Sequence, residues 1–528
     1  MAFWQKKEFW IVLGIFILAA FLRFWQIGGI PPGLYPDEAM NGINALDALE
    51  TGEFKVFYPE NNGREGLFIN IQAISLKIFG PEPWALRGVS AFFGSLTILG
   101  LYLLAKELFG KNPAYFSAFF MAVSFWHINF SRIGFRAIMV PFFTVFAFYF
   151  LFKALRTQKL YCYILAGIFL GLGLHTYIAF RFVPILALLI IAVYFLEWRQ
   201  NHKFPLPSVR RWYGFFFNQG FQKFNIFLAV SAFCVLPLAI YFFNNPEDFI
   251  GRGGQVSVFA SDNVLKELIV SSEKSFLKFF WHGDYNWRHN LAGAPQVLWP
   301  VGILFVIGFA VSVKEIIRQK FRSFGFWFLI FGFFIMSLPE ILTTEGLPHA
   351  LRSIGTIPFV FMFSGLGARA IFSDMRWKKT AHQIWCYLGV GAILAAIGLL
   401  GAFQYFYLWD SRAETQDAFS QGLVDIGRYL RELPSEIQKT VIVNLGGVLV
   451  DGVPMPAATV KFIARGQKNV SYVTEEAINV EFSEKFCRPD DIIIPMIYTE
   501  HLFNKLKTVL PPQTILQQIK DFRVFRCK

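Results

Sequence analysis

Two adjacent carboxylates, Asp37 and Glu38, follow a rigid Pro/Gly turn shortly after the first apolar stretch of the chain. Because neighbouring carboxylates repel each other, one of them is expected to take up a proton or to need a cation nearby. At a membrane surface such a pair is well placed to accept a proton from an incoming hydroxyl group. A second interpretation stays open: Asp37 could cap a helix predicted over Glu38–Leu49, and the two roles are compatible.

The composition is that of a membrane protein. The chain has 528 residues, of which 55% are hydrophobic, 18% aromatic and only 16% charged. Soluble proteins carry about 25% charged residues. The net charge of +13 does not indicate nucleic-acid binding, because the basic residues stand in short clusters between apolar stretches. Five scattered cysteines without a CxxC pair exclude a zinc ribbon or a disulfide scaffold.

Apolar stretches predict an α-helical polytopic membrane protein with about eleven transmembrane helices. They lie near residues 8–28, 84–105, 113–130, 134–153, 160–178, 181–197, 224–243, 297–313, 324–340, 354–371 and 382–406. The first stretch lacks a small-residue cleavage site and is expected to remain as a signal anchor in the cell membrane. With the N-terminus in the cytoplasm, every predicted inner connection is basic, as the positive-inside rule requires. An odd number of spans places the C-terminal segment outside the cytoplasm.

The predicted outer segments, about 29–83, 244–296 and 339–352, are too long or too polar to be simple connections. The first contains amphipathic stretches at Glu38–Leu49 and Leu67–Phe79, which we expect to lie along the membrane interface. After residue 409, short β-like runs alternate with charged helical stretches, so we predict a transmembrane domain over 1–409 and a small extracytoplasmic α/β domain over 410–528. The β-like runs are Thr440–Asn444, Thr459–Ile463, Asp491–Ile497 and Phe522–Arg526. In an oxidising compartment Cys487 and Cys527 could form a disulfide bond.

Cationic side chains gather at the predicted outer ends of the helices, where the positive-inside rule would not place them. Guanidinium groups bind phosphate through paired hydrogen bonds, so these residues suit an anionic lipid head group or a pyrophosphate. For any single arginine, ordinary contact with phospholipid is the alternative. The candidates for phosphate binding are Arg64, Arg132, Arg136, Arg288, His289, His349 and Arg352.

A metal site is a weaker hypothesis. His282, Asp284 and His289 could bind a divalent metal, but their spacing matches no strong metal-binding pattern. We therefore assign no metal ligand and no cofactor from the sequence, and a divalent metal stays open.

The order of these motifs resembles that of the GT-C membrane glycosyltransferases that use polyprenyl-phosphate sugars, in particular the protein O-mannosyltransferase and lipid A aminoarabinose transferase group (glycosyltransferase family 39 type). The resemblance spans roughly residues 8–372. The motifs that carry it are Asp37-Glu38, Arg64-Glu-Gly-Leu67, Leu76-Lys-Ile-Phe-Gly80, Ala85-Leu-Arg87, Leu108-Phe-Gly110, Phe130-Ser-Arg132, Gly283-Asp284, Arg288-His-Asn290 and Pro348-His-x-x-Arg352.

The resemblance implies a GT-C fold and an inverting sugar transfer on the outer face of the membrane. Asp37 would correspond to the acidic base, with Glu38 beside it, and Arg64 would stand where relatives carry a lysine associated with the lipid phosphate. The chain departs from the pattern where Glu65-Gly66 replaces two prolines. This departure leaves the role of Arg64 open.

A second catalytic carboxylate cannot be carried over from the resemblance. Many relatives have an aspartate near position 137, where this chain has alanine. Glu38, Asp284 or Glu340 could take its place, and the sequence does not choose between them.

The implied partners are a polyprenyl-phosphate-linked sugar donor, a glycan, lipid or protein acceptor, and membrane lipids, with no nucleic acid. The alternative from another class is a transporter or flippase of a lipid-linked anionic substrate. Such proteins usually carry ionisable residues in mid-membrane and have paired, interrupted helices. Here the polar residues collect at one face of the predicted bundle, which favours an enzyme.

Overall fold

The computed structural model describes residues 6–201, 219–250, 257–319, 323–373 and 380–528. The chain divides into two compact units. The first comprises Met1–Ile27, Glu65–Phe68 and Arg87–Trp409, and the second comprises Gly28–Arg64, Ile69–Leu86 and Asp410–Lys528. The second unit thus contains most of the first predicted outer segment together with the C-terminal segment. The division into separate domains over 1–409 and 410–528 stays a prediction.

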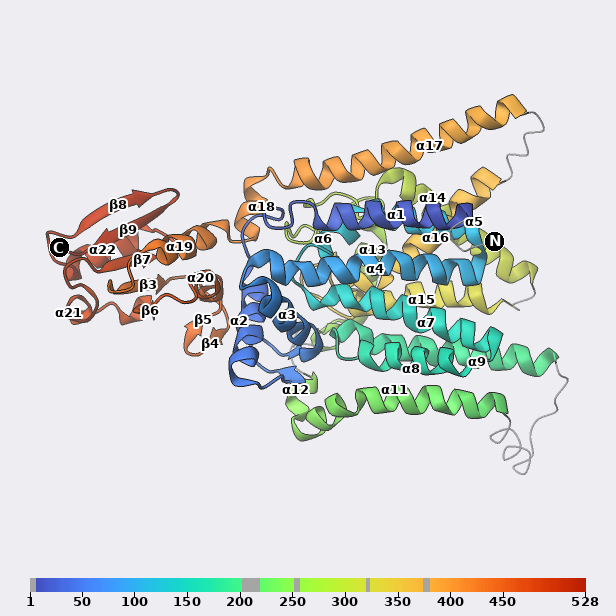
Figure 1. Ribbon diagram of the computed structural model, residues 1–528, viewed down its shortest axis with the longest axis horizontal. Coiled ribbons are helices and arrows are strands. Elements are labelled where there is room, and N and C mark those ends of the chain that lie inside the picture. The colour runs from blue at the N-terminus through green and yellow to red at the C-terminus, as the bar shows by residue number, and fades with distance from the viewer. Residues whose placement is uncertain (1–5, 202–218, 251–256, 320–322, 374–379) are drawn as a thin grey trace. The chain divides into compact units, whose positions relative to one another are not determined.

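The first unit is a bundle of long apolar helices (Figure 1). Its helices are α1 (Lys7–Phe24), α4 (Pro83–Phe109), α5 (Lys111–Val123), α6 (Phe125–Phe130), α7 (Met139–Thr157), α8 (Leu160–Gly173), α9 (Val183–Asn201), α11 (Gln219–Asn244), α12 (Pro246–Ile250), α13 (Val264–Leu277), α14 (Trp299–Arg318), α15 (Phe324–Ile341), α16 (Ile357–Ser373) and α17 (Thr380–Phe403). Helices α14 and α16 pack closely, because a Cβ atom at Gly308 would lie 1.8 Å from the carbonyl oxygen of Phe363. Small residues permit such close packing between membrane helices.

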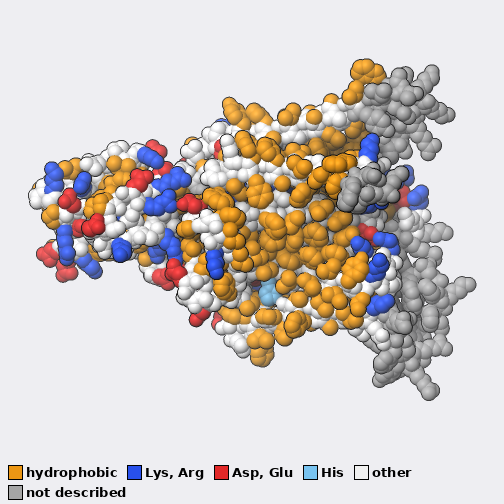
Figure 2. Space-filling model, in the orientation of Figure 1, with side chains coloured by type: hydrophobic (Ala, Val, Ile, Leu, Met, Phe, Trp, Pro, Cys, Tyr) orange, Lys and Arg blue, Asp and Glu red, His pale blue; other side chains and the backbone are white. Residues whose placement is uncertain are grey.

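Seven of the described helices are long and apolar enough to cross a membrane, judged by length and composition. They are Pro83–Phe109, Arg136–Thr157, Gln222–Asn244, Trp299–Arg318, Phe324–Ile341, Ile354–Phe372 and Leu388–Trp409. The prediction of about eleven spans is not confirmed: the predicted span 113–130 is divided at Ser124 between α5 and α6, and α8 has only 14 residues. Hydrophobic side chains cover the visible face of this unit, as expected for a multi-pass membrane protein (Figure 2).

Aromatic side chains hold the start of the loop that joins α13 to α14. The ring centroid of Phe279 lies 5.7 Å from that of Phe305 in α14 and 5.8 Å from that of Phe333 in α15. Phe305 in turn lies 5.6 Å from Phe363 of α16. Aromatic pairs of this kind contribute about 0.5–1.5 kcal/mol beyond the burial of their surface. The cluster therefore fixes the point at which the polar loop leaves the bundle.

The second unit contains a five-stranded sheet of order β6-β3-β7-β9-β8. Its strands are β3 (Lys439–Val443), β6 (Val470–Thr474), β7 (Ile492–Pro495), β8 (Ile515–Ile519) and β9 (Phe522–Arg526). Strands β6, β3 and β7 are parallel, whereas β9 pairs antiparallel with β7 and with β8. A short hairpin of β4 (Leu449–Val450) and β5 (Val453–Pro454) lies outside this sheet.

Alternate residues of β3 face opposite sides of the sheet, as the period of a strand requires. Val441 and Val443 belong to the core formed with α19 (Gln421–Glu432) and α20 (Ala457–Ile463). Ile442 belongs to the core formed with α21 (Phe482–Phe486) and α22 (Glu500–Val509). The predicted α/β region at the C-terminal end is confirmed as a sheet with helices on both faces.

One predicted strand of this region is wrong. Thr459–Ile463 lies in helix α20, whereas Thr440–Asn444, Asp491–Ile497 and Phe522–Arg526 coincide with β3, β7 and β9. The β-branched residues of the run suggested a strand, but tertiary packing decides the outcome. Ala457, Val460 and Ala464 face the sheet core, while Ala458 and Phe462 face a second cluster, and these spacings are helical.

Cys487 and Cys527 form a disulfide bond, the pairing that the sequence left open. The two cysteines are 40 residues apart in the chain. Closing a loop of that size stabilises a domain by roughly 2–4 kcal/mol.

The first predicted outer segment folds into two helices, α2 (Pro36–Thr51) and α3 (Gly66–Phe79), with the short strands β1 (Phe57–Tyr58) and β2 (Arg64–Glu65) between them. Both predicted amphipathic stretches are therefore helical. The core that α2 and α3 share with α19 and α20 comprises Leu34, Ala39, Met40, Ala45, Tyr58, Ile69, Ala73, Leu76, Ala85, Leu86, Val424, Met455, Ala458, Phe462 and Ile463.

Candidate functional site

Asp37 stands at the second position of α2, directly after Pro36. The N-cap residue is Tyr35, so the interpretation of Asp37 as the helix cap is wrong. The side chain of Asp37 is half-buried, and its Oδ1 accepts a hydrogen bond from the side-chain amide of Asn61. Glu38 is fully buried, and its Oε2 accepts a hydrogen bond from the backbone N–H of Tyr35 at 3.2 Å. Glu38 thus completes the start of the helix, whereas Asp37 stays partly accessible.

Asn61 reaches Asp37 from a tight turn. Asn61, Asn62 and Gly63 have φ angles of 53°, 64° and 79°, all in the left-handed region. Asn and Gly tolerate this conformation better than other residues do, which explains the Asn-Asn-Gly sequence. The backbone N–H of Gly63 donates to the carbonyl oxygen of Pro59 at 3.1 Å and closes the turn.

Arg64 follows that turn, and its buried guanidinium lies against the same helix. Its Nη1 donates to Oδ1 of Asn41 at 2.7 Å, and its Nη2 donates to Oδ1 of Asn44. Positions 37, 41 and 44 are spaced by four and three residues, so their side chains share one face of α2. A carboxylate and a guanidinium are therefore aligned along one side of a short helix.

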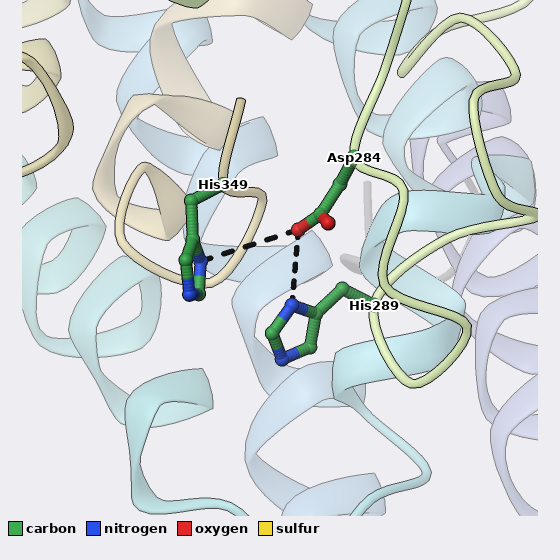
Figure 3. Close-up of side chains that lie close together, drawn as sticks. All are labelled: Asp284, His289 and His349. Atoms are coloured by element: carbon green, nitrogen blue, oxygen red, sulfur yellow. Dashed lines mark hydrogen bonds and ion pairs between the residues drawn. The ribbon is translucent and has the colours of Figure 1, made fainter. Parts of the chain in front are cut away.

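A second group of polar side chains lies in the first unit, between the loop after α13 and the turn after α15 (Figure 3). Asp284 Oδ2 accepts hydrogen bonds from His289 Nδ1 at 2.9 Å and from the backbone N–H of Ala350 at 2.7 Å. Asp284 Oδ1 accepts from the backbone N–H of Asn286 at 2.8 Å. His349 Nδ1 lies 4.0 Å from Asp284 Oδ2, and the two imidazole rings are 4.8 Å apart.

Asp284 fixes the orientation of His289. A carboxylate can only accept here, so Nδ1 of His289 carries the proton and Nε2 is the nitrogen available to a ligand. Burial, and next the neighbouring His289 and Arg352, hold the pKa of His349 well below its usual value, which favours the neutral form of this imidazole.

Imidazole nitrogens and a carboxylate are metal-binding groups. The candidate ligand atoms of Asp284, His289 and His349 all lie within 4.8 Å of one another, so these three residues could hold a metal ion. The sequence had suggested His282 as the third residue, but its ring stacks on Tyr285 at 6.4 Å instead.

A buried ion pair supports this group. Lys278 Nζ and Glu340 Oε2 are in direct contact, and both side chains are at most 1% exposed. Glu340 Oε1 accepts a hydrogen bond from the backbone N–H of His349 at 2.7 Å. Glu340 and Asp284 together therefore hold the consecutive backbone N–H groups of residues 349 and 350 and place the imidazole of His349.

The other predicted cations have protein partners of their own. Arg132 is completely buried, and its Nη1 donates to the carbonyl oxygens of Leu22 and Arg23 at 3.0 Å each. Arg136 Nε donates to Glu65 Oε2 at 2.9 Å. These contacts join α1 and the start of α7 to neighbouring segments, which is a packing arrangement.

Arg288 and Arg352 belong to the same two loops as the histidines and are partly exposed. Arg288 Nε donates to Oδ1 of Asn286 at 3.2 Å. Arg352 Nη1 donates to Thr343 Oγ1 at 2.8 Å and to the carbonyl oxygen of Glu345 at 2.6 Å. Of the seven predicted phosphate-binding residues, His289 and His349 therefore lie together in one group. Arg64 instead binds side chains of α2.

Comparison with known proteins shows what the chain is similar to. The family described as dolichyl-phosphate-mannose-protein mannosyltransferase matches residues 67–209. The Bacillus subtilis (strain 168) protein named "Putative mannosyltransferase YkcB" is 29% identical over 182 residues. That match covers 33% of this chain and 24% of the relative, so the chain aligns with about a quarter of that protein.

Solved structures share the fold over a much longer range. ArnT from Cupriavidus metallidurans bound to undecaprenyl phosphate has a TM-score of 0.56 at 12% identity, covering 99% of this chain and 98% of that one. The Archaeoglobus fulgidus oligosaccharyltransferase tethered with an acceptor peptide has a TM-score of 0.51 at 16% identity, covering 89% of this chain and 64% of that one. The expected GT-C fold is confirmed.

Proposed function

We propose that this GT-C chain is a membrane glycosyltransferase that moves a sugar from a polyprenyl-phosphate donor to a glycan, lipid or protein acceptor outside the cytoplasm. The observation that carries the proposal is the face of α2 on which Asp37 and the Arg64 partners Asn41 and Asn44 are aligned. The likeness to ArnT bound to undecaprenyl phosphate supports the donor class, and the mannosyltransferase family match supports the reaction class.

Asp37 is the proposed general base. Its Oδ1 faces Asn61, so Oδ2 is the oxygen that takes the proton of the acceptor hydroxyl. As the proton leaves, the acceptor oxygen forms a bond to the anomeric carbon of the sugar. The bond between that carbon and the phosphate oxygen breaks, and its electron pair stays on the phosphate. The products are an inverted glycoside and free polyprenyl phosphate.

The leaving phosphate gains negative charge in the transition state and needs cationic or N–H donors nearby. Arg64 is the principal candidate, because its guanidinium donates to the amides of Asn41 and Asn44 on the face of α2 that carries Asp37. Arg288, His289 and His349 are further candidates for the donor. Arg132, Arg136 and Arg352 are assigned to packing, because their guanidinium groups bind backbone carbonyls or nearby side chains.

A transfer assay tests this function. Protein purified in detergent is incubated with a polyprenyl-phosphate-linked radiolabelled sugar and a membrane extract as acceptor source. We expect label to enter a glycoside product with the wild-type enzyme and not with Asp37→Asn. Passage of labelled donor across reconstituted vesicles without any glycoside product would support a transporter instead.

A further inference from the structure

The loop immediately before α2 is hydrogen-bonded to the C-terminal segment of the same unit. The backbone N–H of Gly33 donates to Gln421 Oε1 at 2.6 Å. Thr459 Oγ1 donates to the carbonyl oxygen of Leu34 at 3.0 Å. Gln421 and Thr459 lie in α19 and α20, so two helices of the C-terminal segment contact the backbone within four residues of Asp37.

Shape complementarity accompanies these hydrogen bonds. Gly33 has a φ of 62°, and a Cβ atom there would lie 2.3 Å from the carbonyl oxygen of Phe419. A Cβ atom at Gly42, in the middle of α2, would lie 2.5 Å from the ring of Phe462. Glycine is therefore required at both points of contact, and α2 is packed directly against α20.

Ion pairs orient the C-terminal end of α2. Arg465, just after α20, lies 2.6 Å from Glu50 and 3.6 Å from Asp47. Such partly exposed ion pairs contribute at most about 1 kcal/mol each, so their role is to orient the helix. The C-terminal segment thus contacts α2 before its first turn, in its middle and in its last turn.

We propose that residues 410–528 form a clamp that positions α2 and, through it, the carboxylate of Asp37. The clamp comprises Gln421, Thr459, Phe462 and Arg465. Gly42, which lies against Phe462, points about 100° away from Asn41, which shares its face of the helix with Asp37. The clamp therefore holds α2 without covering the face that carries Asp37. This role rests on the proposed function of Asp37, and it makes the four residues positioning residues without a direct part in the reaction.

The clamp is tested by removing its two hydrogen bonds to the loop. In Thr459→Val/Gln421→Met both side chains keep their size but lose the group that binds the loop. We expect kcat to fall about tenfold or more, since small displacements of a catalytic group have effects of this order, while the Kd for the donor stays within twofold. Thr459→Ser keeps the hydroxyl and should retain wild-type kcat.

A second readout is independent of catalysis. Backbone hydrogen exchange over residues 33–44 should accelerate in Thr459→Val/Gln421→Met but not in Thr459→Ser. The matched control is Thr508→Val/Gln518→Met, which removes the same chemical groups from the same segment, away from the loop before α2. Among the described residues, Thr508 donates to the carbonyl of Lys505, and Gln518 donates to the carbonyl of Lys520 and accepts from Arg523 Nε. This control should change neither kcat nor exchange.

The possible outcomes separate the clamp from other roles of residues 410–528. Unchanged kcat and exchange in the clamp variant would overturn the proposal. An equal loss of donor binding, melting temperature and kcat would identify a general stabilising cap, and a raised KM for the acceptor alone would identify a docking module; either result overturns the clamp. If the wild-type protein transfers no sugar, the proposed function fails while the exchange experiment still tests the clamp.

Discussion

The start of α2 and the loops around Asp284 both present an aspartate, but the two carboxylates are bound in opposite ways. Asp37 is half-buried, and among the described residues its hydrogen bond comes from Asn61. Asp284 is buried, and both of its oxygens accept hydrogen bonds, three in all among the described residues. A carboxylate whose oxygens are already occupied serves to orient its donors, whereas one with an oxygen to spare can take a proton. The comparison supports Asp37 as the base and Asp284 as the residue that positions His289.

The largest effect is expected from Asp37→Asn. The substitution is nearly isosteric and removes the basic oxygen, so transfer should fall by about a hundredfold or more. Donor binding, measured by isothermal titration with polyprenyl phosphate, should change less than threefold. Substantial residual turnover would show that α2 does not carry the base.

Asp284→Asn should have the next largest effect, and of a different kind. The amide nitrogen cannot accept, so at least one buried N–H loses its partner, which costs roughly 1–3 kcal/mol. We expect a lower melting temperature and a fall in transfer of about tenfold, caused by misplacement of His289. If Asp284→Asn lost all transfer at full stability while Asp37→Asn stayed active, the assignment of the two aspartates would be reversed.

Arg64→Gln tests whether the α2 face binds the phosphate of the donor. A charge-assisted hydrogen bond to phosphate contributes about 1.5–3 kcal/mol, so we expect the KM for the donor to rise at least tenfold. Arg64→Lys should be intermediate, because an ammonium group keeps the charge but cannot form paired contacts with Asn41 and Asn44. An unchanged donor KM in Arg64→Gln would show that the α2 face does not bind the phosphate.

The sequence predicts the membrane class, the helices α2 and α3 and the C-terminal sheet because each rests on a local pattern. Hydropathy over a span, the period of an amphipathic helix and the runs of β3, β7 and β9 can all be read from neighbouring residues. The helix α20 could not be predicted in this way. Its β-branched residues are helical only because one face meets the sheet and the other meets α2.

The candidate site was predicted in its residue types and less well in its pairings. Asp37 was selected as one of two adjacent carboxylates after a Pro/Gly turn. Arg64, His289 and His349 were selected as cations at the predicted outer ends of the helices, where the positive-inside rule would not place them. Their partners depend on contacts between distant segments, as between Asp284 and Ala350. Asn61 was missed because its only local signal, the Asn-Asn-Gly turn, is typical of any tight turn.

Asn61→Ala tests the single amide contact of Asp37. Without the amide donor the carboxylate loses an orienting hydrogen bond of about 1.5 kcal/mol, so kcat should fall roughly tenfold while the donor KM stays unchanged. Asn62→Ala, in the same turn, is the matched control and should alter kcat less. Equal losses in both variants would assign the effect to the turn and not to the contact with Asp37.

The smallest effect is expected from Arg352→Gln. The guanidinium of Arg352 binds Thr343 and the backbone of Glu345, and its ion pair with the exposed Glu345 carboxylate is 3.4 Å long. An exposed pair of this kind contributes about 0–1 kcal/mol, so donor KM and kcat should stay within about threefold of wild type. The measurement is the same transfer assay as for Arg64→Gln, made side by side at one salt concentration because added salt screens phosphate contacts. If Arg352→Gln raised the donor KM as much as Arg64→Gln does, the guanidinium would have to leave its partners in the 343–345 turn when the donor binds. Arg352 would then take part in phosphate binding, and the contrast between the two aspartates would no longer decide where the donor is bound.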